Sequence, residues 1–241
     1  MAALVTVRVD ESAFRAAMDD IGQRQVPYAT ATALTATAYR GMAATVKEME
    51  RVFDRPTRYT LNSLRVSGAN KTALVATVEF RDFAGKGTPA AKYIKPQVEG
   101  GPRGAKKFEG KLMHAGFLGV GHHLVPTKAA PLDQYGNPSR GQYARILSAL
   151  GAQTTKSDNS GAKKVRDLGY FWGNPHGMGA GIWQRFRFGH GWALKPMFLD
   201  VRTPAYRKRL PFAEVQGRVV QSYFPEEFAA AVQRIAAKFG G

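Results

Sequence analysis

The sequence contains no cysteine and no apolar run near the ~20 residues that a bilayer-spanning helix needs. Without cysteine, the chain has no disulfide framework, no thiolate ligand for zinc and no thiol nucleophile. Residues Met1–Asp10 alternate apolar and polar side chains and so lack the apolar core of a signal peptide. These absences exclude cysteine-dependent enzymes, and we expect a chain that folds in a cytoplasm and has no membrane partner.

Acidic side chains are scarce in the middle of the chain. Residues 83–213 hold 21 Lys and Arg but only six Asp and Glu, which gives this segment +15 of the total formal charge of +17. Residues 1–82 and 214–241 are nearly balanced. One interpretation is that the cations only solvate a surface rich in loops. Solubility does not require charge to be concentrated in one segment, so we favour an electronegative partner, either nucleic acid or an acidic protein face.

The same scarcity of acids argues against catalysis. Metal-dependent nucleases need clustered acids, and no such cluster stands out here. His122 and His123 are the only closely spaced histidines, and neighbouring residues of a strand point to opposite faces. Gly177–Gly181 resembles a phosphate-binding loop, but it lacks the Lys-Ser/Thr ending and precedes a predicted strand. We therefore expect no catalytic residue, no metal, no cofactor and no enzymatic activity.

Length and composition indicate an ordinary globular chain. Hydrophobic residues make up 44% and aromatic residues 11% of 241 residues, which excludes a disordered or collagen-like chain. We expect a single domain over residues 1–241, with a loop-rich basic insertion at about 84–168. Glycine and proline clusters predict a loop over 84–104, and residues 153–164 have no large apolar side chain, which predicts a mobile surface excursion.

Helical periodicity is strongest near the two ends of the chain. Apolar residues at spacings of three and four predict a long helix over 28–53 and another over 212–239, which Pro225 should bend or split. Shorter helices are predicted over 105–115, exposing Lys106, Lys107 and Lys111, and over 140–150. Residues 4–9 alternate as a strand does and precede a short helix up to Ile21.

Alternating segments elsewhere predict strands. Residues 61–66 and 72–80 flank turn residues and predict a hairpin, and 122–125 is a further candidate. Residues 170–172, 181–186 and 195–201 should complete one sheet with that hairpin. The expected fold class is α+β, a mostly antiparallel sheet flanked by a long N-terminal helix and a C-terminal helix, with long basic loops.

Aromatic residues interleave with arginine in the last third of the chain. Their strand periodicity favours packing in a core, and the alternative is a stacking platform for single-stranded nucleic acid. The residues concerned are Tyr170, Phe171, Trp172, Trp183, Phe186, Phe188 and Trp192, with Arg185 and Arg187.

Several segments together resemble the prophage minor tail protein Z family of tailed bacteriophages. The resemblance begins with Met49–Thr57 at the end of the Ala- and Thr-rich helix and continues into Tyr59–Val66. It returns in later segments, namely Gly87–Tyr93, Tyr135–Gln142, Ile182–Phe186 and Lys195–Phe198. None of these motifs is catalytic, and together they run through most of the chain.

The resemblance implies a virion structural protein, a tail completion or head-tail connector (neck) component. Such a subunit would form a homo-oligomeric ring around the DNA channel and bind other neck, portal-side or tail proteins, after assembly in the host cytoplasm. Basic loops would approach packaged duplex DNA without reading its sequence. The candidate DNA-channel or partner-contact residues are Lys86, Lys92, Lys95, Arg103, Lys106, Lys107, Lys111, Lys163, Lys164, Arg166, Arg207, Lys208 and Arg209. A sequence-independent DNA-binding protein remains the alternative, and a hydrolase or nuclease is a third.

Overall fold

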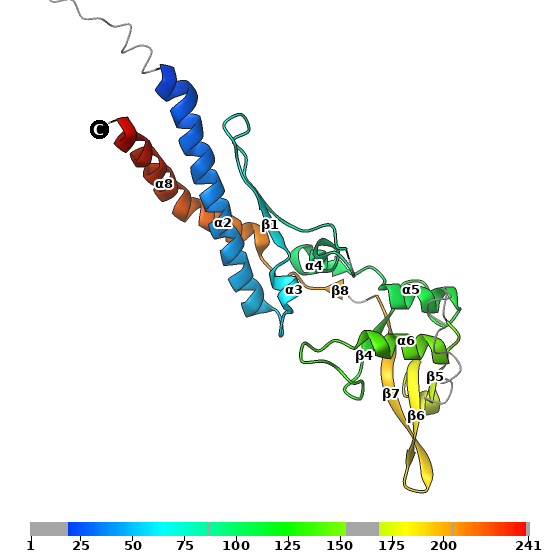
Figure 1. Cartoon of the computed structure of the whole chain (residues 1–241). Coiled ribbons are helices and arrows are strands. Elements are labelled where there is room, and N and C mark those ends of the chain that lie inside the picture. Colours follow the sequence, from blue (N-terminus) through cyan, green and yellow to red (C-terminus); the bar gives the residue numbers. More distant parts are fainter. Residues whose placement is uncertain (1–18, 86, 153–168, 204, 240–241) are drawn as a thin grey trace, which may run out of the picture. The chain divides into compact units, whose positions relative to one another are not determined.

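The computed structural model describes residues 19–85, 87–152, 169–203 and 205–239 (Figure 1). Contacts divide the chain into two compact units. We call residues 1–53, 58–92 and 210–241 the helical unit, and residues 54–57 and 93–209 the basic unit. The basic unit holds 20 Lys and Arg against seven Asp and Glu, a formal excess of +13, and the helical unit has only +4. The single domain expected from the sequence stays a prediction.

Two long helices form the helical unit, and both were predicted. Helix α2, Val26–Val52, follows a short π-helix, η1 (Ile21–Gln25), and ends where Phe53 becomes extended. Helix α8, Phe212–Phe239, continues through Pro225. Pro225 was expected to bend or split this helix, and it does not split it. The predicted strand at 4–9 and most of the short helix after it lie outside the described residues.

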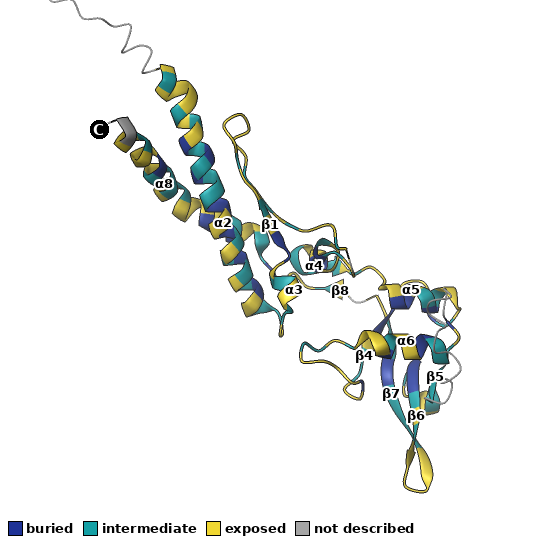
Figure 2. Ribbon diagram, in the orientation of Figure 1, coloured by how far each residue is buried: buried dark blue, intermediate teal, exposed yellow. Residues whose placement is uncertain are grey.

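Small side chains on α2 allow α8 to approach closely. Ala29, Ala33 and Gly41 are buried (Figure 2). The Gln216 amide of α8 donates hydrogen bonds to the Gly41 carbonyl at 3.0 Å and to Thr45 Oγ1 at 2.7 Å. A Cβ atom on residue 41 would lie 2.1 Å from Gln216 Oε1, so glycine makes room for this polar contact. Small residues along α2 thus permit its close packing against α8.

The predicted hairpin also belongs to the helical unit. Strands β1 (Leu64–Ser67) and β2 (Thr77–Phe80) pair antiparallel after the short helix α3 (Arg58–Leu61). The Ala69 N–H donates to Thr35 Oγ1 of α2 at 3.0 Å. The hairpin forms a sheet of its own and packs against α2. The expectation that it joins the later strands in one sheet was therefore wrong, because its partner is a helix.

The four-stranded antiparallel sheet of the basic unit has the order β4-β7-β6-β5. Its strands are β4 (His122–Pro126), β5 (Tyr170–Gly173), β6 (Gly181–Phe188) and β7 (Gly191–Arg202). Helices α5 (Lys107–His114) and α6 (Arg140–Ala149) contribute Phe108 and Ile146 to the core that also buries Phe198 of β7. These strands and helices confirm the sequence prediction for this region.

A helix occupies much of the segment predicted as a loop over 84–104. Helix α4, Ala90–Glu99, buries Ala90 and Ile94, each 1% exposed, and contains Pro96. Proline in a helix interior removes one hydrogen bond, and the apolar residues spaced four apart outweigh that loss. Gly100 ends the helix in the left-handed region at φ 81°, and its N–H donates to the Pro96 carbonyl at 3.0 Å. Prediction from the Gly and Pro clusters alone was wrong here.

The α+β class is confirmed, with antiparallel sheets, a long N-terminal helix and a C-terminal helix. None of the described helices combines the length and the apolar run that a membrane crossing needs. Residues 153–164, predicted as a surface excursion, lie outside the described residues.

Strands β6 and β7 approach each other closely at Gly181, and a substitution there tests this approach. A Cβ atom there would lie 2.1 Å from the Phe198 carbonyl oxygen, and φ is 157°. We expect Gly181→Ala to lower the free energy of unfolding by about 2 kcal/mol or more. Urea unfolding followed by tryptophan fluorescence measures this, because all three tryptophans are in the basic unit.

The matched control is Gly110→Ala in α5. Gly110 is exposed, and a Cβ atom there has no neighbour within 4 Å. Alanine should stabilise the helix by up to about 1 kcal/mol. Equal effects of the two substitutions would contradict the close approach of β6 and β7.

Candidate functional site

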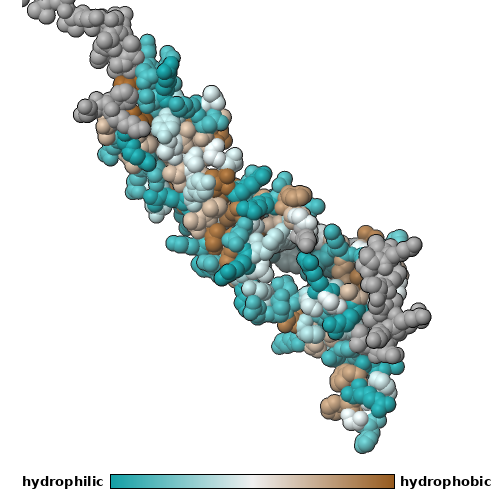
Figure 3. Space-filling model, viewed as in Figure 1, coloured by the Kyte–Doolittle hydropathy of each residue, from teal (hydrophilic) through white to brown (hydrophobic). Residues whose placement is uncertain are grey.

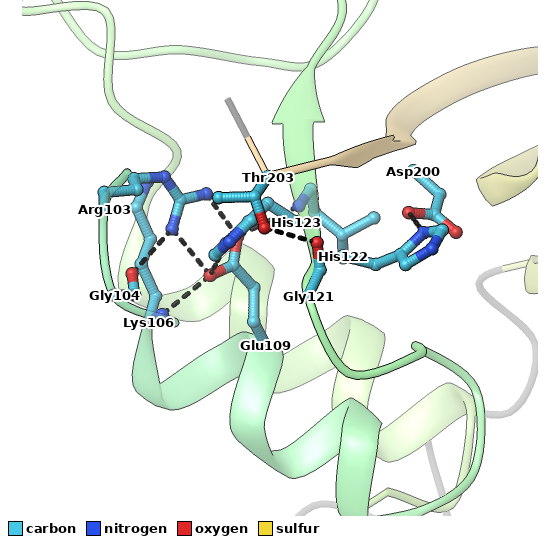
Figure 4. A network of polar contacts seen from close by, with 10 residues as sticks. Arg103, Gly104, Lys106, Glu109, Gly121, His122, His123, Asp200 and Thr203 are labelled. Atoms are coloured by element: carbon cyan, nitrogen blue, oxygen red, sulfur yellow. Dashed lines mark hydrogen bonds and ion pairs between the residues drawn. The ribbon is translucent and has the colours of Figure 1, made fainter. Parts of the chain in front are cut away.

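A buried carboxylate, Glu109, organises one end of the basic unit (Figure 4). It lies in the first turn of α5 and is 1% exposed. The Arg103 guanidinium donates two hydrogen bonds to it, one of them at 2.8 Å. The backbone N–H of Lys106 donates at 2.7 Å and that of Leu124 at 2.9 Å. Glu109 therefore connects α5 to strand β4 and to the segment before the helix.

The environment of Glu109 keeps it ionised. Burial alone would raise its pKa, but Arg103 and the two backbone N–H groups outweigh burial and lower the pKa from 4.5 to about 2. A carboxylate with so low a pKa is a weak general base at neutral pH. His123 Nδ1 lies 3.4 Å from Glu109 Oε2, and its ring is also buried. This network binds the backbone N–H groups of Lys106 and Leu124 and is poorly suited to accept a proton from a substrate.

The neighbouring histidine points to the other side of β4. His122 Nδ1 lies 2.8 Å from Asp200 Oδ1 of β7 and its side chain is 37% exposed (Figure 4). The prediction that His122 and His123 diverge is confirmed. Asp200 can orient the imidazole, but in the described part of the chain no hydroxyl bonds to its second ring nitrogen. Nor do three His, Asp or Glu side chains gather as metal ligands among the described residues.

Most described cations of the predicted site lie on two segments of the basic unit, residues 95–111 and 205–209, that a short strand pair joins. Strand β3 (Gly101–Pro102) pairs antiparallel with β8 (Ala205–Tyr206). The Arg209 N–H donates to the Gln97 carbonyl at 2.8 Å. This pairing brings two segments far apart in the sequence side by side. We call the cations on them the basic edge: Lys95, Arg103, Lys106, Lys107, Lys111, Arg207, Lys208 and Arg209.

The cations of the basic edge are not equivalent. The Arg103 side chain is only 14% exposed and is held by Glu109, so little of it is open to a partner. Lys95 lies 3.7 Å from Glu99 and Lys111 is half-buried. The remaining five are exposed: Lys106, Lys107, Arg207, Lys208 and Arg209.

Other predicted residues lie elsewhere. Lys92 is exposed on α4 but belongs to the helical unit. Lys86, Lys163, Lys164 and Arg166 lie outside the described residues.

The aromatic segment contains both buried and exposed rings, so core packing is confirmed for part of it and the stacking platform stays a prediction. Trp183 is 1% exposed, and its Nε1–H donates to the Gly179 carbonyl at 3.2 Å, as expected of a core residue. Phe188 and Trp192, nearer the turn of the same hairpin, are 75% and 65% exposed. Strand periodicity does not distinguish these two cases, because a strand keeps its alternation where it extends beyond the core.

Two parts of these sites were missed from the sequence. Lys195 was not named as a candidate, and Arg185 and Arg187 were named only beside the aromatic rings and not among the DNA-channel or partner-contact residues, although no Asp or Glu occurs anywhere in residues 168–199. That run without acids was a usable signal. Glu109 was not predicted to organise a buried network. The one feature of the sequence that sets it apart is that it is the single acid within the basic stretch 103–111.

The Glu109 network makes stability depend on pH. Because the pKa of Glu109 is lowered in the folded state, its contribution is complete above pH ~4.5 and is lost as the pH falls towards 2. We expect Glu109→Gln to lower the free energy of unfolding by about 3 kcal/mol at pH 7, since it leaves Arg103 without its counter-charge. Between pH 5 and about 2.5 the variant should lose less stability than the wild type.

Glu99→Gln is the control for Glu109→Gln. Glu99 pairs with Lys95 at the surface, where both side chains are more than 60% exposed. Its loss should change stability by less than about 1 kcal/mol. Parallel pH profiles for wild type and Glu109→Gln in urea unfolding would contradict the low pKa.

Comparison with family models, with curated proteins and with solved structures finds no match to this chain.

Proposed function

We propose that this chain is a structural subunit of a tailed bacteriophage, a tail completion or head-tail connector component that forms a ring around the DNA channel. The observation that carries the proposal is the difference in charge and exposed apolar surface between the two units. One unit is nearly neutral and exposes large apolar side chains, and the other is strongly basic. The motifs that resemble the minor tail protein Z family supply the identity of the assembly.

The helical unit provides the surface for assembly. Tyr28 and Tyr39 on α2 are 47% and 54% exposed, and Val220 on α8 is 50% exposed. Tyr28 and Tyr39 line an open groove of about 540 Å³ between α2 and residues 69–71. Apolar residues gathered on one surface favour association. Contacts between unlike surfaces of identical subunits close into a ring when the rotation between them permits.

The basic unit provides the surface that faces DNA. Lys106, Lys107 and Arg207 of the basic edge are exposed. Cations of this kind bind phosphates and release counterions without reading bases. That chemistry suits a channel through which duplex of any sequence passes.

The alternative function is sequence-independent DNA binding by a protein that does not assemble. The formal charge of +13 on the basic unit favours it. It requires no ring, so the two candidates differ in what the purified chain does without DNA.

Mass measurement by light scattering separates the two functions. At low and at physiological salt, the ring proposal expects one defined multimer of the 26.3 kDa chain, with little change on adding short duplex DNA. A monomer that binds duplex with an affinity falling steeply as salt rises supports the alternative. A monomer that does neither would contradict ring formation by this chain alone.

Tyr39→Glu tests the assembly surface. A charge within an exposed apolar surface should dissociate the multimer, because association would have to desolvate it. Gln134→Glu in the basic unit adds the same single charge at another exposed position and should leave the mass unchanged. Retention of the multimer by Tyr39→Glu would place the assembly contact elsewhere.

A further inference from the structure

Strands β6 and β7 continue into a hairpin whose outer half carries exposed rings. We call residues 184–195 the aromatic hairpin. A two-residue turn, Gly189–His190, joins the strands, with Gly189 in the left-handed region at φ 58°. Glycine at this place suits the tight turns of β-hairpins. The register sets Phe188 opposite Gly191, and Arg187 opposite Trp192.

The exposure of the rings rises towards the turn. Trp183, before the hairpin begins, is 1% exposed, whereas Trp192 is 65% and Phe188 is 75% exposed. Figure 3 shows hydrophobic and hydrophilic residues side by side at the lower tip of the view, where Figure 1 draws the turn between β6 and β7. A tryptophan usually buries a large area, so one left open in a protein is a candidate binding surface.

Three rings in this region, those of Trp192, Phe186 and Phe171, are each paired with a cation. Arg187 Cζ lies 5.6 Å from the centre of the Trp192 ring, and Lys195 Nζ lies 5.2 Å from that of Phe186. Arg185 Cζ lies 5.8 Å from the centre of the Phe171 ring on the adjacent strand β5. These contacts orient the cations over the aromatic faces and leave their charge unneutralised.

No carboxylate competes for these cations within the segment. Residues 168–199 contain no Asp or Glu, and the first acid after them, Asp200, is engaged by His122. Among the residues that the structure describes, the surface therefore combines flat apolar rings with positive charge alone. A ligand that fits it must present flat apolar faces and negative charge at a short repeat.

Single-stranded nucleic acid has this combination. Its bases stack on aromatic side chains while its phosphates meet Arg and Lys, and every base offers such a face. Duplex DNA stacks its bases on one another and hides those faces. An acidic peptide offers charge without the rings. Trp192 and its paired Arg187 lie on one face of the hairpin, and Phe188 lies on the other. We propose that the aromatic hairpin binds single-stranded DNA or RNA without sequence specificity, through stacking on Trp192 beside Arg185 and Arg187.

This site does not depend on ring assembly. It rests on the hairpin of the basic unit, whereas the proposed function rests on the helical unit and the basic edge. The mass measurement and the binding measurement can therefore fail separately.

The test is fluorescence anisotropy of a dye-labelled dT12 oligonucleotide with the full chain. We expect binding that weakens with salt, and a loss of affinity of about tenfold for Trp192→Leu, which keeps an apolar side chain but removes the ring. Trp192→Phe should retain most of the affinity because it keeps an aromatic face. Arg187→Ala should weaken binding and make it less dependent on salt.

Two control variants separate the site from general effects. Phe83→Ala removes an 81% exposed ring and Arg218→Ala an exposed arginine, both in the helical unit. Both should bind dT12 as the wild type does. Far-ultraviolet circular dichroism and the emission of the buried Trp183 check that each hairpin variant is folded.

Three outcomes would overturn the proposal. The first is equal loss of affinity in Arg187→Ala and Arg218→Ala, which indicates binding by general charge alone. The second is binding of Trp192→Leu as tight as that of the wild type. The third is displacement of dT12 by poly-glutamate at a lower concentration than by unlabelled dT12, which identifies an acidic polypeptide as the better ligand.

Discussion

The Arg103–Glu109 ion pair is the constraint on which the order of the basic unit depends. Glu109 satisfies two backbone N–H groups and one guanidinium at a place that excludes water. Through these contacts it fixes the start of α5, strand β4 and the segment that precedes the helix. A buried carboxylate without such partners would be protonated or expelled. Its low pKa shows how completely those partners offset the cost of burial.

The helical unit is stabilised by different interactions. Long helices with small residues in their interface gain little from each side chain, so close approach and polar contacts must supply the rest. Gly41 leaves room for the Gln216 amide, which bonds to a backbone carbonyl and to Thr45. Arg40 adds an ion pair to Glu227 across the same helices at 2.7 Å. Some large apolar residues of α2 and α8, among them Tyr39 and Val220, therefore remain exposed.

The sequence predicted elements better than their assembly. Long helices and the strands of the four-stranded sheet were found because periodicity is local. The partner of the β1–β2 hairpin was missed, because alternation shows that one face is covered but not what covers it. Helix α4 was missed because Pro96 and its flanking glycines outweighed the spacing of Ala90 and Ile94. Arg103 was identified as a surface cation, since its pairing with Glu109 depends on the fold.

The excess positive charge of the basic unit affects its stability. Its described residues include 16 Lys and Arg but five Asp and Glu, and each of those acids is already engaged. Three lie beside an Arg or Lys, Asp200 bonds to the His122 ring, and Asp133 accepts backbone hydrogen bonds in a turn. Among the described residues, the unit therefore has no carboxylate left to neutralise its other cations, and mutual repulsion between those cations lowers the stability of the compact state. An electronegative partner of the proposed kind would offset that repulsion, so binding and folding of this unit would favour each other.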